Sequence, residues 1–400
     1  MTIEKYLALT RDFIYGEDND ADLLKAVLRD FYNELNIELI IINSDISRNE
    51  AVVSGTRNYL IWDESFWTYY NDHMYKLLIL DEKYKDPMLC EQYLDFLISD
   101  QIRFVIHKLK YYDKNSAIIL AKYYVSRFKK TCKINFDTQN FHMMILLSKL
   151  YVLFHECSHF KYKDKSGKSY IERAESTIKA IKLSKNLFAN QLLSQSLNAD
   201  KLYTETELSR LLDSFIAKSD GKNLEELVFD SIAFSNCLTI YYNGMCNGNF
   251  DVFANRLSFL VNSVRVLRSF SKMLKLFDSG INVMIKNEDY ISNIDSKKAI
   301  DEIITRNSLS LYVEQIQTFL FFIKEKADYP THKITSAFCS DEQRPYKFVN
   351  EKYLYPYINF ILGEVLVELL HDMNNRTLVS NMEDKDKMID FLMSYSKPKR

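Results

Sequence analysis

The spacing of hydrophobic residues predicts a chain that is mainly helical. Apolar positions recur at helical spacing over residues 3–14 and 21–35, and again from about residue 65 to 126. The same period returns over much of the chain from 171 to 218 and from 252 to 395, as in amphipathic helices. Only eight glycines and five prolines interrupt the 400 residues, which disfavours an all-β chain with many tight turns.

One short region follows a different pattern. Between residues 37 and 63, three β-branched or aromatic runs occur close together, at 37–43, 51–54 and 59–62. Runs of this kind, separated by polar turns, predict strands, and their closeness favours a small antiparallel sheet. The expected fold is therefore α+β and mainly helical, with this sheet beside a central helix.

The most hydrophobic segment, 141–161, is apolar on nearly all sides and predicts a central, buried helix. A further helix is predicted over 224–242, where Asn223 would be the N-cap. Polar turns then follow at residues 243–249. We expect a core over residues 1–245 and a helical C-terminal region over 250–400.

The buried segment ends in His155-Glu156-Cys157-Ser158-His159. Two histidines four residues apart lie on one face of a helix, so both rings can reach a single metal ion. Zinc lowers the pKa of a bound water, and the carboxylate beside the first histidine can accept its proton. The pattern predicts a zinc site with Glu156 as general base.

A catalytic zinc needs a third protein ligand and one open position. No histidine follows at the close HExxHxxGxxH spacing, so the ligand is expected on a later helix. Glu226 and Asp230 lie four residues apart in the apolar helix 224–242. Glu226 would bind the metal, while Asp230 would accept the free N–H of a zinc histidine. Two alternatives stay open: Glu225 is a neighbouring acid, and Asn223 with Glu226 is similar to a capping box.

An HExxH sequence followed well downstream by ExxxD resembles the gluzincin metallopeptidases. The resemblance implies that Glu226 is the third ligand, that Asp230 supports it, and that Ala233 is the small residue often found three positions later. Phe229 departs from the pattern, because an alanine commonly precedes the aspartate. In outline the chain is also similar to the bacterial phage-exclusion (Lit-type) proteases. The resemblance therefore implies an intracellular zinc metalloendopeptidase that acts on protein or peptide substrates, in stress or phage defence.

Composition narrows the setting in which such a site would work. The formal net charge is −2 and no segment is strongly basic, which argues against nucleic-acid partners. The six cysteines are isolated, as in the reduced thiols of a cytosolic protein. The apolar stretch over 141–154 is broken by Lys149 and is shorter than the roughly 20 residues that a spanning helix needs. We expect no membrane segment and a cytoplasmic location.

Two other functions stay open from the sequence. Glu156 and His159 form an ExxH pair, and a second pair, Glu368 and His371, is preceded by Glu364. Two such pairs are typical of ferritin-like di-iron bundles, although this arrangement leaves His155 unused and gives the sheet no place. The chain would otherwise be an inactive metallopeptidase-like protein that senses a partner. In either peptidase-like case the C-terminal helices offer a surface for a protein regulator.

Overall fold

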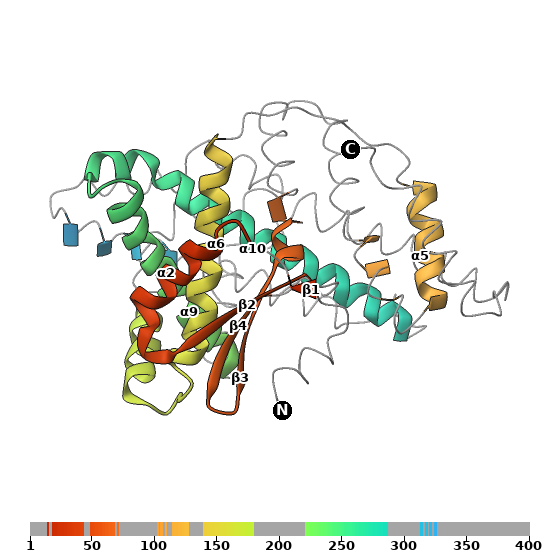
Figure 1. The fold of residues 1–400 in the computed structure, drawn as a ribbon, viewed down its shortest axis with the longest axis horizontal. Coiled ribbons are helices and arrows are strands. Elements are labelled where there is room, and N and C mark those ends of the chain that lie inside the picture. Colours follow the sequence, from red (N-terminus) through yellow and green to blue (C-terminus); the bar gives the residue numbers. More distant parts are fainter. Residues whose placement is uncertain are drawn as a thin grey trace, which may run out of the picture. The chain divides into compact units, whose positions relative to one another are not determined.

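Figure 1 shows the computed structural model of the chain. It describes residues 14–15, 18–43, 49–68, 70–71, 114–127, 139–179 and 221–286, together with single residues within 102–109 and 313–325. Most of these are helical, and four short strands form one sheet. The α+β, mainly helical fold expected from the sequence is confirmed.

The chain forms two compact units. The first contains residues 1–67, 138–268 and 300–347, and the second contains residues 68–137, 269–299 and 348–400. All of the site residues discussed below belong to the first unit. The separation of a core over 1–245 from a region over 250–400 stays a prediction.

The sheet is mixed, so the expectation of an antiparallel sheet was wrong in one pairing. Its strand order is β1 (Ile14–Tyr15), β2 (Ile37–Asn43), β4 (Arg57–Asp63) and β3 (Glu50–Ser54). β3 and β4 form an antiparallel hairpin around Gly55, which has a positive φ of 63°. β2, however, pairs with β4 in parallel. The three strand positions predicted from sequence are confirmed.

Burial explains why β4 rather than β3 lies beside β2. The β4 side chains from Tyr59 to Asp63 are all buried, which suits a strand covered on both faces. The side chains of β3 are only partly buried, and Val53 is exposed. A half-buried strand is better placed at an edge of the sheet, so the chain crosses from β2 to the far edge before it returns.

Two helices build the floor of the site. α6 (Gln139–Lys161) contacts β3, β4 and α9 (Gly221–Ile240). α6 spans the predicted segment 141–161 and carries the whole His155–His159 sequence within its last two turns. α9 continues as a π-helix over Tyr241–Met245. The chain segments that carry the HExxH and ExxxD patterns are thus packed side by side (Figure 1).

The second of the two predicted polar turns, at residues 247–249, is confirmed, whereas the predicted helix end at residues 243–244 was wrong because these residues lie inside the π-helix. Asn247 and Gly248 adopt positive φ angles of 50° and 65°, which glycine and asparagine tolerate best. The side chain of Asn249 then accepts hydrogen bonds from the backbone amides of Asp251 and Val252. It therefore caps α10 (Phe250–Lys286).

A buried lysine fastens the first part of the chain to α6. The Lys149 ammonium group donates hydrogen bonds to Asp18 at 2.7 and 2.8 Å and to Asp20 at 2.7 Å. The indole N–H of Trp62, in β4, donates to the same Asp18 carboxylate. The one charge that interrupts the apolar segment is therefore paired, and it connects α6 with the sheet and with the residues before α2 (Ala21–Tyr32).

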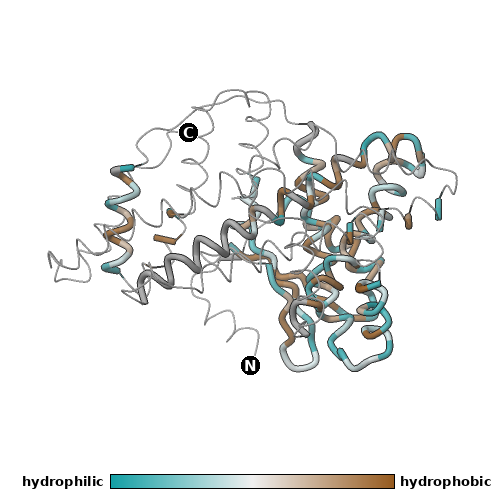
Figure 2. Tube along the Cα trace, turned by 180° about the vertical axis from the view of Figure 1, so that it is seen from behind, coloured by the Kyte–Doolittle hydropathy of each residue, from teal (hydrophilic) through white to brown (hydrophobic). Residues whose placement is uncertain are grey.

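Hydrophobic positions follow the packed helices and the sheet, and hydrophilic ones gather at the turns (Figure 2). The core of the first unit includes Leu24, Leu60, Leu147, Phe154 and Phe234, which are completely buried. No helix within the described residues has the length and apolar character needed to cross a membrane.

Candidate metal centre

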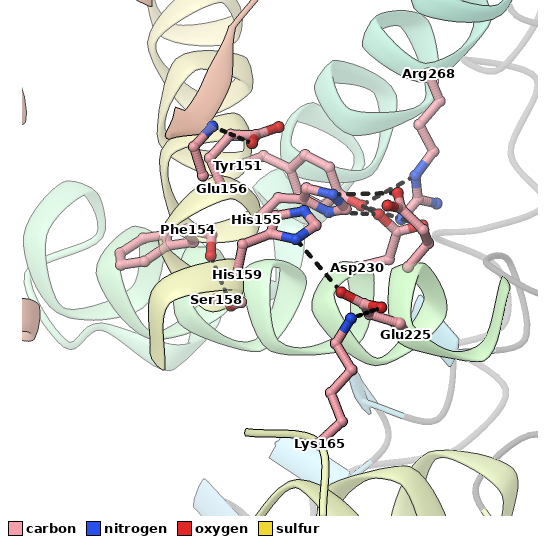
Figure 3. A network of polar contacts seen from close by, with 12 residues as sticks. Tyr151, Phe154, His155, Glu156, Ser158, His159, Lys165, Glu225, Asp230 and Arg268 are labelled. Carbon is pink, nitrogen blue, oxygen red and sulfur yellow. Dashed lines mark hydrogen bonds and ion pairs between the residues drawn. The ribbon is translucent and has the colours of Figure 1, made fainter. Parts of the chain in front are cut away.

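His155 and His159 lie one turn apart on α6, with their ring centroids 5.5 Å apart. The helix is regular here, and the Ser158 hydroxyl donates to the Phe154 carbonyl within it (Figure 3). One ligand atom from each of His155, Glu156 and His159 can be chosen so that all three lie within 4.8 Å of one another. The geometry therefore brings both imidazoles to one place, as the i and i+4 spacing requires.

α9 places two carboxylates against the two nitrogens of His155. Oε2 of Glu226 lies 3.5 Å from Nε2, and Oδ1 of Asp230 lies 3.0 Å from Nδ1. Two ligand atoms at about 2.0–2.1 Å from a tetrahedral zinc are about 3.3 Å apart. The separation of Glu226 and His155 is close to that value. Asp230 lies beside the nitrogen at which a carboxylate commonly orients a metal-binding histidine, but the contact here is an ion pair without hydrogen-bond geometry.

His159 has a corresponding arrangement with a different acid. Its Nδ1 lies 3.5 Å from Oε1 of Glu225. The other carboxylate oxygen of Glu225 forms an ion pair with Lys165, which lies in the loop after α6 (Figure 3). Glu225 was the alternative third ligand in the sequence. The structure places Glu225 instead against Nδ1 of His159, just as Asp230 lies against Nδ1 of His155.

Phe229, the departure from the gluzincin pattern, packs between these groups. Its ring lies edge-to-face against His159 at 4.6 Å and against His155 at 6.1 Å. On its other side it joins a buried cluster with Tyr162 and Tyr170. Aromatic packing of this kind restricts ring rotation, so the phenylalanine limits the orientations open to both histidines.

Glu156 points away from α9 and toward the sheet. Its Oε2 accepts a hydrogen bond of 3.0 Å from the backbone amide of Ala51 in β3 (Figure 3). Burial raises the pKa of Glu156 to about 7, although His155 and the Ala51 amide act in the opposite direction. A carboxyl group whose pKa lies near neutrality is suited to accept and return protons.

The carboxylates around His155 create a strong preference for a cation. Burial alone would lower the pKa of His155, but Asp230, Glu226 and Glu156 together raise it to about 10. The pKa of His159 is lowered, first by burial and then by the positive charge of His155. The cluster thus favours a cation between these side chains, which a proton or a divalent metal can supply. Two imidazoles and one carboxylate are a donor set that zinc accepts. Among the described residues, the three whose ligand atoms all lie within 4.8 Å of one another are His155, Glu156 and His159, and Glu226 is not one of them.

The structure does not support the alternative in which Asn223 and Glu226 form a capping box. α9 begins at Gly221, so Asn223 lies inside the helix rather than at its N-cap. The prediction that Asn223 caps this helix was wrong, because residues 221–223 are already helical. Glu226 lies in the second turn and its carboxylate faces His155, which a capping residue would not do.

A buried group of three residues behind Asp230 was not identified from the sequence. The Tyr151 hydroxyl donates a 2.7 Å hydrogen bond to Oδ1 of Asp230, and it accepts hydrogen bonds from Arg268 of α10. Arg268 also forms an ion pair with Glu314. Tyr151 had a signal, since it precedes His155 by one helical turn. Arg268 and Glu314 lie more than 100 residues away, and nothing in their spacing connects them with the motif.

Comparison with protein-family models, with curated proteins and with solved structures found no match to this chain. The resemblance to gluzincins therefore rests on the two short sequence patterns carried by α6 and α9, and it stays a prediction. The second ExxH pair, Glu368 and His371, and the preceding Glu364 lie outside the described residues. The di-iron alternative stays a hypothesis.

Proposed function

We propose that the chain is a zinc-dependent metallopeptidase in which His155, His159 and Glu226 hold the metal and Glu156 is the general base. The observation that carries the proposal is the placement of two carboxylates from α9 at the two ring nitrogens of His155. One carboxylate is at ligand separation and the other is at orienting distance. A chance HExxH sequence would not require either contact.

Zinc bound at these residues would supply Lewis acidity and lower the pKa of water to near neutrality. The side chains of the protein have separate tasks. Asp230 would pair with Nδ1 of His155, while Nε2 lies 3.5 Å from Glu226. Glu156 is held at one carboxylate oxygen by the Ala51 amide, so its other oxygen is available to accept a proton from water and to pass it to a leaving amine.

The neighbouring strand supports a peptide as the substrate. In the described sheet β3 is an edge strand, and its Ala51 amide points toward Glu156 rather than into the ladder. Backbone N–H and C=O groups point to alternate sides along a strand, so those of Val53 point to the same side as those of Ala51. Unpaired backbone groups of an edge strand can bind an extended peptide. We therefore propose a protein or peptide substrate.

Substituting Glu156 by Gln tests the proposal. We expect hydrolysis of a peptide library to fall by about 10²–10⁴-fold, since the general base is lost, while one zinc per chain is retained by elemental analysis. Glu172→Gln, on an exposed helical face, is the matched control and is expected to cleave like the wild type. Equal cleavage by Glu156→Gln and the wild type would refute the peptidase proposal.

The same measurements separate the alternatives. A wild-type protein that binds zinc yet cleaves no peptide would support the inactive, partner-sensing protein. About two irons per chain would support the di-iron protein. A role in stress or phage defence stays a prediction that depends on the identity of the substrate.

A further inference from the structure

We propose that Arg268 of α10 is a positioning residue for the metal ligand His155, acting through Tyr151 and Asp230. The inference rests on the proposed function, since it assumes that His155 binds a metal. It assigns a role to a helix that carries neither the HExxH nor the ExxxD pattern.

A continuous series of contacts joins Arg268 to His155 (Figure 3). Nε and Nη2 of Arg268 both donate to the Tyr151 hydroxyl, which donates in turn to Oδ1 of Asp230. Nη2 also lies 3.8 Å from Oδ2 of Asp230. Oδ1, the oxygen that receives the tyrosine hydrogen bond, is the one that lies 3.0 Å from Nδ1 of His155. The tyrosine hydrogen bond therefore holds Oδ1, while the contact at Oδ2 is a longer ion pair.

This arrangement constrains the carboxylate more than a single partner would. The side chains of Arg268 and Asp230 are 12% and 5% exposed, so water contributes little to their hydrogen bonding. The guanidinium is planar and presents its donors in a fixed fork. With the fork held by Tyr151 and, at Nη1, by Glu314, Asp230 cannot rotate without breaking a buried, charge-assisted contact. A fixed Oδ1 keeps a carboxylate 3.0 Å from Nδ1 of His155, as an ion-pair partner without hydrogen-bond geometry.

The main alternative is that Arg268 only holds α10 against α6. The two roles differ in what they change at the metal. A packing residue alters the free energy of unfolding, but in the folded protein it leaves metal affinity and ligand geometry unchanged. A positioning residue alters both of the latter, including in a variant that is fully folded.

The experiment measures zinc affinity of the full-length, metal-free protein by competition with a chromophoric chelator, and the visible absorption spectrum of the cobalt-substituted protein. Arg268→Met removes the charge with similar side-chain length, and Tyr151→Phe removes only the hydroxyl. Tyr241→Phe is the matched control, because its buried hydroxyl donates to the Arg256 carbonyl instead. Thermal unfolding of each variant establishes that it is folded.

We expect Arg268→Met to weaken zinc binding by about 10–100-fold, as changes in the outer shell of metal sites do. Tyr151→Phe should weaken binding by about 3–10-fold on the same scale, shift the cobalt bands and leave the fold intact. Arg268→Lys should restore only part of the loss. Tyr241→Phe should match the wild type in affinity and spectrum.

Unchanged affinity and cobalt spectra in Tyr151→Phe and in every folded Arg268 variant would overturn the inference, and the metallopeptidase proposal would stand. If Arg268→Met fails to fold, Tyr151→Phe decides the matter alone. A wild-type protein that binds no zinc or cobalt would instead refute the proposed function itself. The two failures are thus distinguishable.

Discussion

His155 and His159 belong to one five-residue motif, yet their surroundings are opposite in kind. His155 faces Asp230, which is buried and backed by Tyr151 and Arg268. His159 is 30% exposed, and the acid at its Nδ1 is backed by Lys165, which is 49% exposed. One histidine is held by a buried network and the other by a contact that reaches the surface.

The comparison shows where the rigidity of the site comes from. Breaking a buried ion pair leaves an uncompensated charge and costs several kcal/mol. The pair of Glu225 and Lys165 has side chains that are 10% and 49% exposed, so solvent screens it more and it contributes less. If the site holds a metal as proposed, we expect the buried end to define ligand geometry. We expect the end that reaches the surface to adjust when a metal or a substrate binds. The predictions below test this difference between the two ends.

The largest expected difference is between Asp230→Asn and Glu225→Gln. Each substitution removes one negative charge beside a histidine and preserves side-chain shape. We expect Asp230→Asn to weaken zinc binding by about 10–100-fold, since it disturbs the orienting partner of His155. Glu225→Gln should weaken it by about threefold or less, because Lys165 can turn into solvent and its ion pair is worth little. Chelator competition on both metal-free variants measures the ratio.

Thermal unfolding provides the control for that pair. Asp230→Asn is also expected to lower the free energy of unfolding, since Arg268 loses one of its buried partners. Glu225→Gln should change it much less. Equal zinc affinities for the two variants would contradict the proposed division between a rigid and an adjustable end.

The next difference concerns protons. The pKa of His155 is raised to about 10 and that of His159 is lowered. Zinc must therefore displace a proton from His155 but not from His159 at neutral pH. Below about pH 10 the protonated form of His155 dominates, so raising the pH removes the competitor. We expect zinc affinity to rise by about tenfold per pH unit between pH 6 and 8.

Calorimetry of zinc binding in buffers of different ionisation enthalpy counts the released protons. We expect about one proton per zinc in the wild type and fewer in Asp230→Asn, where the carboxylate that favours protonation of His155 is lost. A pH-independent affinity would show that His155 is already neutral. That result would contradict the proposed difference in pKa between His155 and His159, but not the difference in their contacts.

Much of the fold followed from local patterns in the sequence. Helical spacing and an all-round apolar segment located α6 within two residues, and β-branched runs located β2, β3 and β4. The order of the strands in the sheet could not be predicted from these patterns. β2 and β3 run in opposite directions both in a simple antiparallel order and in the observed order, so their directions do not distinguish the two. Only the burial of β4 on both faces, compared with the half-exposed β3, decides which strand lies in the centre.

The site divides in the same way. Five site residues could be proposed from the sequence because their spacing within a helix fixes their relative positions. They are His155, Glu156 and His159 on α6, and Glu226 and Asp230 on α9. The residues behind these side chains could not be predicted, because they reach the site by tertiary packing alone. Arg268 lies behind Asp230, Lys165 pairs with Glu225, and Ala51 contacts Glu156. Glu225 was visible in the sequence, but its contact with His159 rather than with a metal depends on how α9 is rotated against α6.

The smallest expected effect concerns Glu156, the residue between the two histidines, which belongs to neither end. Its contact is the Ala51 amide of the edge strand β3. Ala51→Pro removes that N–H without removing a ladder hydrogen bond, and proline is tolerated in edge strands. We expect kcat for peptide hydrolysis to fall by about three- to tenfold, since one neutral hydrogen bond is worth about 1 kcal/mol. Zinc affinity should be unchanged, because both histidines and their carboxylates are untouched.

Val53→Pro is the matched control: it places the same ring on the same side of the same strand, away from Glu156, and should cleave like the wild type. Equal losses in both variants would mean that proline disturbs the strand itself. A loss of zinc in Ala51→Pro alone would mean that the sheet helps to hold the metal ligands, so that the two ends of the site are less independent than the contacts of His155 and His159 indicate.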